Sequence, residues 1–269
     1  MKLLNGSELA GFIKERQAHQ VRSLRQSQGI APKLAIIVTV DHPAIDVYVR
    51  MKQRYGADIL IDVELHRVSQ VEVPKLLESL NADPGVHGII VQLPLADPLQ
   101  TDEITNMVAP EKDVDALGQN AIYDPATPMA ILWLLAGYNI ELAGKRIVLV
   151  GRGKLVGAPL ERILVAGEYD VTVIDRQTPD LQGEVRAADI LVTATGTPGL
   201  ITSTMIAKNA VVVDAGVAGE QGKTVGDLDP TVYEREDITL TPQKGGVGPL
   251  TICALFDNVI RAARATTQK

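Results

Sequence analysis

A glycine-rich segment between a predicted strand and a predicted helix could bind a phosphate group. The segment Val150–Gly157 (VGRGKLVG) has the form G-x-G-x-x-x-G. Glycine allows a tight turn and a close approach of the backbone to a pyrophosphate, and free N–H groups at the helix start bind the anion. Because the spacing is one residue longer than the usual dinucleotide fingerprint, a glycine-rich turn without a ligand is the alternative.

Charged residues near this loop could select the nucleotide. At the end of the next strand an acid holds the ribose hydroxyls of NAD, whereas an arginine holds the 2′-phosphate of NADP. The sequence has both, in Asp175 and Arg176, and Arg152 in the loop is a second arginine. Two arginines favour NADP, and Asp175 keeps NAD possible.

A second group of polar residues lies in the first half of the chain. Tyr48 and Lys52 are four positions apart, which puts them on one face of a helix. Gln92 ends an apolar run, and Asp113 and Asp115 follow in the segment KDVD. Each has a plain interpretation as a core-edge, solvated or capping residue. Their expected position at the carboxyl ends of strands favours a ligand site.

The segment Thr241–Thr251 (TPQKGGVGPLT) is the third unusual feature. Three glycines and two prolines before a helix indicate a tight, preformed loop, and Thr251 could cap that helix. Such a loop could pass close to a cofactor or a substrate, or it could simply link two domains.

These residues need strands and helices to position them. Apolar runs predict strands over residues 33–40, 59–63 and 88–93, and helical periodicity predicts helices over residues 7–28, 44–56 and 71–80. A second cycle follows a loop at residues 115–127, with strands at 145–150, 171–174, 190–194 and 210–214 and helices at 128–138, 157–167 and 251–265. This alternation implies βαβ units and a mainly parallel sheet.

We therefore expect an α/β protein with two α/β domains flanking a cleft. The first domain would span residues 1–120, and the second, a Rossmann-type nucleotide-binding domain, residues 121–250. The C-terminal helix, residues 251–269, is expected to pack back on the first domain.

Composition excludes several classes of protein. A net charge of -7 and 3% aromatic residues argue against nucleic-acid binding. No apolar run approaches the ~20 residues that a membrane helix needs, and the N-terminus becomes polar too early for a secretory signal. The single cysteine, Cys253, is expected to be a buried structural thiol. We expect a cytoplasmic protein without a membrane or nucleic-acid partner and without a metal site.

Six motifs, in order and nearly end to end, resemble the methylenetetrahydrofolate dehydrogenase/cyclohydrolase family. They are PAIDVYVRMK (43–52), GIIVQLPL (88–95), PEKDVD (110–115), VGRGKLVGAP (150–159), VGD (225–227) and TPQKGGVGPLT (241–251). The resemblance implies a homodimer, with a tetrahydrofolate derivative against the first domain and NADP on the second. It implies hydride transfer from methylenetetrahydrofolate, then hydrolysis of the methenyl product to 10-formyltetrahydrofolate, as in one-carbon metabolism and purine biosynthesis.

The resemblance also assigns roles to residues. Lys52 matches a catalytic lysine, Gln92 the glutamine that orients it, Tyr48 a tyrosine stacked beside the folate, and Asp115 the acid that binds the pterin. Substrate is also expected at Gly246, Val247 and Pro249. The residues expected at the cofactor are Gly151, Arg152, Gly153, Val156, Gly157, Asp175, Arg176, Thr195, Gly196, Gly216 and Val217.

Several positions depart from the family pattern. Ile45 stands where serine is common near the catalytic lysine, Ala116 replaces a usual glycine, and Gly153 replaces a usual serine. Gln243-Lys244 replaces Val-Pro, the segment 117–127 is short, and Ala126 stands where cysteine is common. Two alternatives follow, a monofunctional dehydrogenase of the same family and a noncatalytic folate- or nucleotide-binding relative. A hydride-transfer enzyme for another small substrate would not require the KDVD and QLP segments.

Overall fold

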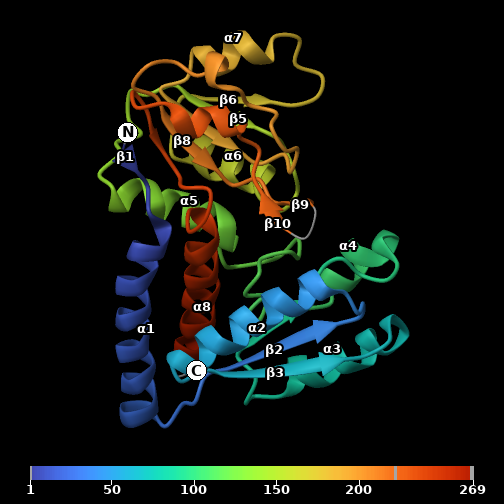
Figure 1. Cartoon of the computed structure of the whole chain (residues 1–269). Coiled ribbons are helices and arrows are strands. Elements are labelled where there is room, and N and C mark those ends of the chain that lie inside the picture. Colours follow the sequence, from blue (N-terminus) through green and yellow to red (C-terminus); the bar gives the residue numbers. More distant parts are fainter. Residues whose placement is uncertain (1, 221–222, 267–269) are drawn as a thin grey trace. The chain divides into compact units, whose positions relative to one another are not determined.

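The chain forms two compact units, each built from segments that are distant in sequence. Figure 1 shows the computed structural model, which describes residues 2–220 and 223–266. One unit combines residues 1–10 with 127–251, and the other combines residues 11–126 with 252–269. We call them the six-stranded unit and the three-stranded unit. Residues 2–10, which the sequence assigns to the first domain, thus belong with the six-stranded unit.

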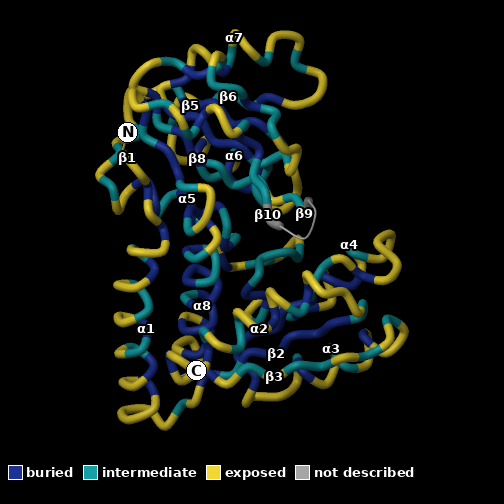
Figure 2. Tube along the Cα trace, viewed as in Figure 1, coloured by how far each residue is buried: buried dark blue, intermediate teal, exposed yellow. Residues whose placement is uncertain are grey.

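The three-stranded unit contains a parallel sheet in the order β3-β2-β4. Its central strand β2 is buried along almost its whole length, as the apolar run predicts, and Figure 2 shows this buried trace. The strands are β2 (Lys33–Val38), β3 (Asp62–Arg67) and β4 (Gly88–Val91). The helices are α2 (Pro43–Asp58), α3 (Val73–Ala82) and α4 (Thr101–Thr105), with the greater part of α1 (Gly6–Gln28) and of α8 (Val247–Ala265).

The six-stranded unit contains a second parallel sheet, in the order β1-β11-β8-β7-β5-β6. Its strands are β1 (Lys2–Leu3), β5 (Ile147–Val150), β6 (Val171–Ile174), β7 (Ile190–Thr193), β8 (Val211–Asp214) and β11 (Thr239–Leu240). A separate antiparallel pair joins β9 (Ala218–Glu220) to β10 (Lys223–Val225). The helices are α5 (Ala126–Gly137), α6 (Gly157–Ala166) and α7 (Leu181–Arg186).

The strand order reverses direction at β5. The chain goes from β5 to β6 on one side and then returns to β7 on the other side of β5. This reversal is the switch point at which doubly wound parallel sheets bind nucleotides. The predicted fold class, α/β with a Rossmann-type unit, is confirmed.

Two predicted elements differ from the structure. The second strand, expected at 59–63, lies further along the chain, because α2 continues to Asp58 and β3 spans Asp62–Arg67. Between them the backbone turns at Leu60, which has φ 65°. The strand is hard to detect in the sequence because β3 is an edge strand that alternates polar residues with partly buried ones.

The last helix begins at Val247 rather than at Thr251. Thr251 lies inside α8 and does not cap it, so the predicted cap is wrong. Gly248 and Pro249 read as loop residues in the sequence, yet proline fits the first turn of a helix because its missing N–H has no partner there anyway.

Among the described residues, no helix is both long and apolar enough to cross a membrane.

Candidate functional site

Helix α2 presents Tyr48 and Lys52 on a face next to its buried stripe. The helix begins at Pro43, where the Nδ1 atom of His42 accepts a hydrogen bond from the N–H of Ala44 (3.2 Å). Ile45 and Val49 are 5% and 2% exposed and form the buried stripe. Tyr48 is 41% exposed, whereas Lys52 is partly buried, so only the lysine is largely removed from water.

The Lys52 ammonium is held by the Gln92 amide. Lys52 Nζ donates to Gln92 Oε1 at 2.8 Å. Gln92 follows β4 directly, and its Nε2 donates to the carbonyl of Leu93 at 3.1 Å, which turns the amide oxygen toward the lysine. The backbone N–H of Gln92 donates to the Ile37 carbonyl at 2.9 Å, which anchors the residue at the end of the sheet. The predicted Lys52–Gln92 pair therefore forms.

Asp115 belongs to the same group by its electrostatic effect. Burial lowers the pKa of Lys52 below its usual value, and the negative charge of Asp115 partly opposes this change. Burial likewise raises the pKa of Asp115, and the positive charge of Lys52 opposes that change. A lysine with a lowered pKa, held by an amide and close to a carboxylate, can exchange a proton with a bound molecule.

Asp113 shapes the loop that carries Asp115. It is 3% exposed, and its carboxylate accepts hydrogen bonds from the N–H groups of Gly118 (2.8 Å) and Leu117 (3.3 Å). Between them Ala116 has φ 56°, a left-handed conformation that favours glycine. Asp113 thus stabilises a loop, which agrees with a structural role rather than a ligand-binding one.

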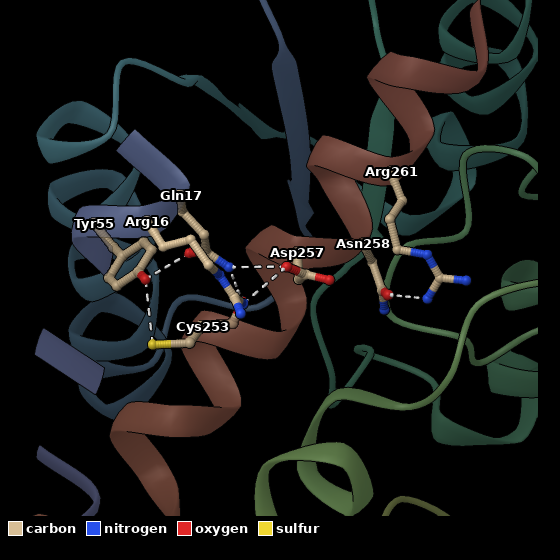
Figure 3. A network of polar contacts seen from close by, with 7 residues as sticks. All are labelled: Arg16, Gln17, Tyr55, Cys253, Asp257, Asn258 and Arg261. Atoms are coloured by element: carbon tan, nitrogen blue, oxygen red, sulfur yellow. Dashed lines mark hydrogen bonds and ion pairs between the residues drawn. The ribbon is translucent and has the colours of Figure 1, made fainter. Parts of the chain in front are cut away.

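Asn258 on α8 holds the other side of this loop, and the sequence analysis missed it. Its Nδ2 donates to the carbonyls of Val114 (3.0 Å) and Asp124 (2.9 Å). Figure 3 shows Asn258 pointing away from the helix beside Arg261, whose guanidinium lies 3.4 Å from Asn258 Oδ1. The sequence carries little signal for this role, because Asn258 stands beside Asp257 in a helix that also contains Arg261.

The other half of Figure 3 shows how α2 is fixed against α1 and α8. The Tyr55 hydroxyl lies 2.7 Å from Gln17 Oε1 and 3.2 Å from Cys253 Sγ, and its ring centroid is 5.0 Å from that of Phe256. Cys253 is fully buried, so it is the structural thiol that the sequence predicts. Tyr55 follows Lys52 by three residues, so this packing also holds the helix that carries the lysine.

The glycine loop has the shape of a phosphate cradle. Gly151 has φ 103°, and a Cβ there would lie 2.7 Å from the Ala194 carbonyl oxygen. A Cβ at Gly157 would lie 2.0 Å from the Gly151 carbonyl oxygen. The N-cap of α6 is Val156, whose side chain makes no capping hydrogen bond, so the helix start has donors for an anion. These residues fit a dinucleotide.

The charged residues around this loop differ in their partners. The Arg152 guanidinium pairs with the Glu161 carboxylate through Nε (2.8 Å) and Nη2 (2.9 Å). Asp175 Oδ1 accepts a hydrogen bond from the N–H of Gln177 at 2.8 Å, and the neighbouring Arg176 is exposed. Of the two arginines, Arg152 is thus already engaged within the protein.

The remaining predicted residues lie directly after strands or at the start of α8. Thr195 and Gly196 follow β7, and Gly216 and the exposed Val217 follow β8. Gly246 precedes α8, while Pro249 and the buried side chain of Val247 lie in its first turn. At Gly153 a Cβ would meet no atom within 4 Å, so the family's usual serine would fit there.

The sheet reversal and the glycine loop define a nucleotide-binding α/β protein, with a lysine–amide–carboxylate group on a second α/β unit. Two family models match the chain: residues 4–115 match the tetrahydrofolate dehydrogenase/cyclohydrolase catalytic domain, and residues 125–267 match the NAD(P)-binding domain of the same family. The chain belongs to the tetrahydrofolate dehydrogenase/cyclohydrolase family.

Individual relatives agree with this assignment. The chain is 40% identical to the bifunctional protein FolD of Heliobacterium modesticaldum over 272 residues, 96% of this chain and 94% of the relative. The crystal structure of the bifunctional FolD enzyme from Campylobacter jejuni has a TM-score of 0.93 at 34% identity and covers 99% of both chains. That of the Trypanosoma brucei enzyme, complexed with NADP cofactor and an inhibitor, has a TM-score of 0.92 at 29% identity over 99% and 98% of the chains.

Proposed function

We propose that this chain oxidises methylenetetrahydrofolate to methenyltetrahydrofolate with NADP⁺ and then hydrolyses the product to 10-formyltetrahydrofolate. The observation that carries the proposal is the 2.8 Å contact between Lys52 and Gln92, on a lysine whose pKa is lowered by burial. Both the family and its relatives support the pair of activities.

Lys52 would act in the hydrolysis. Water attacks the cationic methenyl carbon, and the neutral amine of Lys52 takes the proton that this water loses. The hydroxyl of this adduct then loses its proton and becomes the formyl oxygen as the bond from that carbon to N5 breaks. N5 takes up one of the two protons that the water has lost, the other is released to solvent, and the formyl group remains on N10. Gln92 accepts a hydrogen bond from one N–H of the Lys52 amine. This contact orients the amine so that its nitrogen lone pair would face the water.

Asp115 and Tyr48 would bind the folate. A carboxylate can accept two hydrogen bonds from the amino group and ring nitrogen of a pterin, and the exposed ring of Tyr48 offers a surface for stacking. Asp115 also acts electrostatically on Lys52, so the folate-binding residue and the proton-transfer residue would be coupled.

The nucleotide would lie on the loop Gly151–Gly157, with the pyrophosphate at the start of α6. When bound, NADP⁺ supplies the acceptor for the hydride. The protein contributes position, because hydride transfer needs alignment more than a protein acid or base. We favour NADP because Arg176 is exposed at the end of β6, and Asp175 beside it leaves NAD as the alternative.

The experiment follows the reduced cofactor and the methenyl product together by absorbance, with methylenetetrahydrofolate and each nucleotide in turn. Formation of reduced cofactor and decay of the methenyl signal faster than without enzyme would support both activities. Accumulation of the methenyl product would indicate a monofunctional dehydrogenase. The apolar, buried Ile45, about two helical turns before Lys52, favours this alternative. No reaction with either nucleotide would indicate a noncatalytic relative.

Replacement of the lysine tests its role directly. Lys52→Met should lower the hydrolysis rate by at least the ~10²-fold typical of losing a general base, without changing the Kd for NADP⁺. Lys75→Met is the matched control, since Lys75 is an exposed lysine on α3 of the same unit. Wild-type hydrolysis by Lys52→Met would remove this residue from the mechanism.

We also propose that the protein is a homodimer that works in the cytoplasm. The dimer follows from the family resemblance, and the location agrees with a substrate and nucleotide of central metabolism. Light scattering after size exclusion measures the mass, and a particle of one chain's 28.8 kDa would contradict the dimer.

A further inference from the structure

The motif Val225–Asp227 (VGD) has no part in the chemistry described above, yet it ends in a fully buried carboxylate. Asp227 is 0% exposed. A buried charge is costly unless hydrogen bonds or a partner charge compensate for it. The Asp227 carboxylate accepts one hydrogen bond at each oxygen, from the N–H of Thr195 (2.7 Å) and from the N–H of Thr197 (2.9 Å). It therefore fixes the loop that follows β7.

A second aspartate holds this one in place. Asp214 ends β8, and its Oδ1 accepts hydrogen bonds from the N–H groups of Gly216 (2.9 Å) and Asp227 (3.1 Å) and from the Thr193 hydroxyl (3.0 Å). Its Oδ2 accepts from the N–H of Leu228 at 3.3 Å. Asp214 thus joins the end of β7, the loop after β8 and the VGD segment.

Two glycines let the carboxylates come this close to the backbone. A Cβ at Gly226 would lie 1.9 Å from Asp214 Oδ2, and a Cβ at Gly216 would lie 2.2 Å from Asp227 Oδ1. Any side chain at either position would push a carboxylate away from its N–H donors. The glycine in VGD is therefore required by Asp214, and Gly216 is required by Asp227.

The two loops that these aspartates fix lie where a nucleotide is expected. Thr195 and Gly196 follow β7, which lies beside β5, the strand that leads into the glycine loop. Gly216 follows β8, the next strand in the sheet, so both loops lie at its carboxyl edge. We propose that Asp227 and Asp214 are positioning residues, which set these two loops in the conformation that accepts the nicotinamide nucleotide. This inference rests on the proposed function of the loops.

The test compares Asp227→Asn with Asp229→Asn. The amide at position 227 turns an NH₂ group toward one of the two N–H donors, so it loses one bond and adds a repulsive contact. Asp229 is a matched control because it lies two residues away and accepts from the N–H of Thr231 (2.9 Å) at the start of a 3₁₀ helix. Calorimetry measures the Kd for NADP⁺, and steady-state assays separate the KM for NADP⁺ from the KM for folate.

For Asp227→Asn we expect the Kd and the KM for NADP⁺ to rise about tenfold or more, as expected for loss of a charged hydrogen bond. The hydrolysis rate without nucleotide should stay within about twofold of wild type, because Lys52, Gln92 and Asp115 belong to the other unit. Asp229→Asn should match wild type in every assay. A purely structural role would lower both activities together.

An unchanged affinity of Asp227→Asn for NADP⁺ would overturn the inference while leaving the proposed function intact. A wild-type protein that binds neither nucleotide would overturn both. If Asp227→Asn does not fold, Thr193→Val removes only the hydroxyl that donates to Asp214 and keeps the volume. It should raise the Kd for NADP⁺ several-fold, and an unchanged Kd would overturn the inference.

Discussion

The charge state of Lys52 depends on two opposing effects within the same site. Burial disfavours the ammonium and lowers the pKa, while the nearby Asp115 carboxylate favours the ammonium and raises it. Only the neutral amine accepts a proton from water. In the proposed mechanism, Asp115 would therefore help to set the pH at which Lys52 accepts a proton, in addition to its proposed role in binding the pterin.

This balance predicts the pH dependence of hydrolysis. The kcat should rise with pH through the pKa of Lys52 and level off above it. Asp115→Asn removes the charge that raises this pKa. The rising part of the curve of kcat against pH should therefore move to lower pH. The measurement is kcat against pH at saturating methenyltetrahydrofolate, corrected for the uncatalysed reaction.

Asp124→Asn is the control for this pH experiment, because Asp124 is an exposed acid that pairs with Arg261 instead. Its rising limb should coincide with that of the wild type. A limb that stays in place or moves to higher pH in Asp115→Asn would contradict the assigned electrostatic effect.

The backbone conformation of Ala116 leads to a prediction about the stability of the protein. Its φ of 56° is a left-handed conformation, which destabilises the folded state by about 1–2 kcal/mol for a residue with a side chain. Replacing alanine by glycine also has a cost, because the greater entropy of the unfolded chain lowers the stability by about 0.4–1 kcal/mol. Ala116→Gly should therefore raise the free energy of unfolding by about 0.5–1 kcal/mol. Urea unfolding measures it, with Ala121→Gly in the same loop as a control that should be neutral or destabilising.

At the scale of elements, α8 contributes to the three-stranded unit a side chain that reaches the KDVD loop. Asn258 is 4% exposed and binds two backbone carbonyls on either side of Asp115 and the following turn. Asn258→Leu has similar volume but leaves both carbonyls without this donor. We expect a loss of about 2–3 kcal/mol in the free energy of unfolding and a higher KM for folate.

The nucleotide affinity should separate this effect from general misfolding. Asn258→Leu should bind NADP⁺ like the wild type, because the glycine loop lies in the other unit. Asp257→Asn, the preceding residue on α8, should change neither the KM nor the Kd. An unchanged KM for folate in Asn258→Leu would show that the KDVD loop holds its conformation without this contact.

The elements that the sequence predicts well are those whose signal is local. The buried strand β2 and the glycine loop before α6 are visible in ten residues or fewer, because burial and turn geometry act on neighbouring positions. The predicted position of the edge strand β3 differs from the observed one, because half of its residues face water and it has no continuous apolar run. The roles of Asn258 and Asp227 come from hydrogen bonds to residues that are 144 and 32 positions away in the sequence. No local sequence pattern indicates such contacts.

At the scale of the whole molecule, neither unit is a continuous stretch of chain. The three-stranded unit takes residues 11–126 and then residues 252–269, so the two compact units cannot be separated by one cut. The chain leaves this unit after Ala126 and returns at Ile252. The two crossing points are adjacent, since the hydroxyl oxygens of Thr127 and Thr251 lie 3.4 Å apart.

This arrangement predicts that a fragment of residues 11–126 does not fold alone. It lacks Phe256, Val259 and Ile260, which are each at most 1% exposed and which together stabilise the unit by roughly 5–9 kcal/mol. That amount is comparable with the ~5–15 kcal/mol by which a whole domain is stable. Circular dichroism should show no cooperative thermal transition for the fragment.

A second fragment makes the prediction decisive. Residues 11–126 joined to residues 252–269 by a few glycines should regain the transition, because the neighbouring threonines show that a short linker is enough to close the gap. The same fragment with Phe256→Ala should lose about 3–5 kcal/mol and unfold at lower temperature. A cooperative transition in the fragment of residues 11–126 without α8 would show that the helix is dispensable, and that this unit is stabilised by its sheet and its own helices alone.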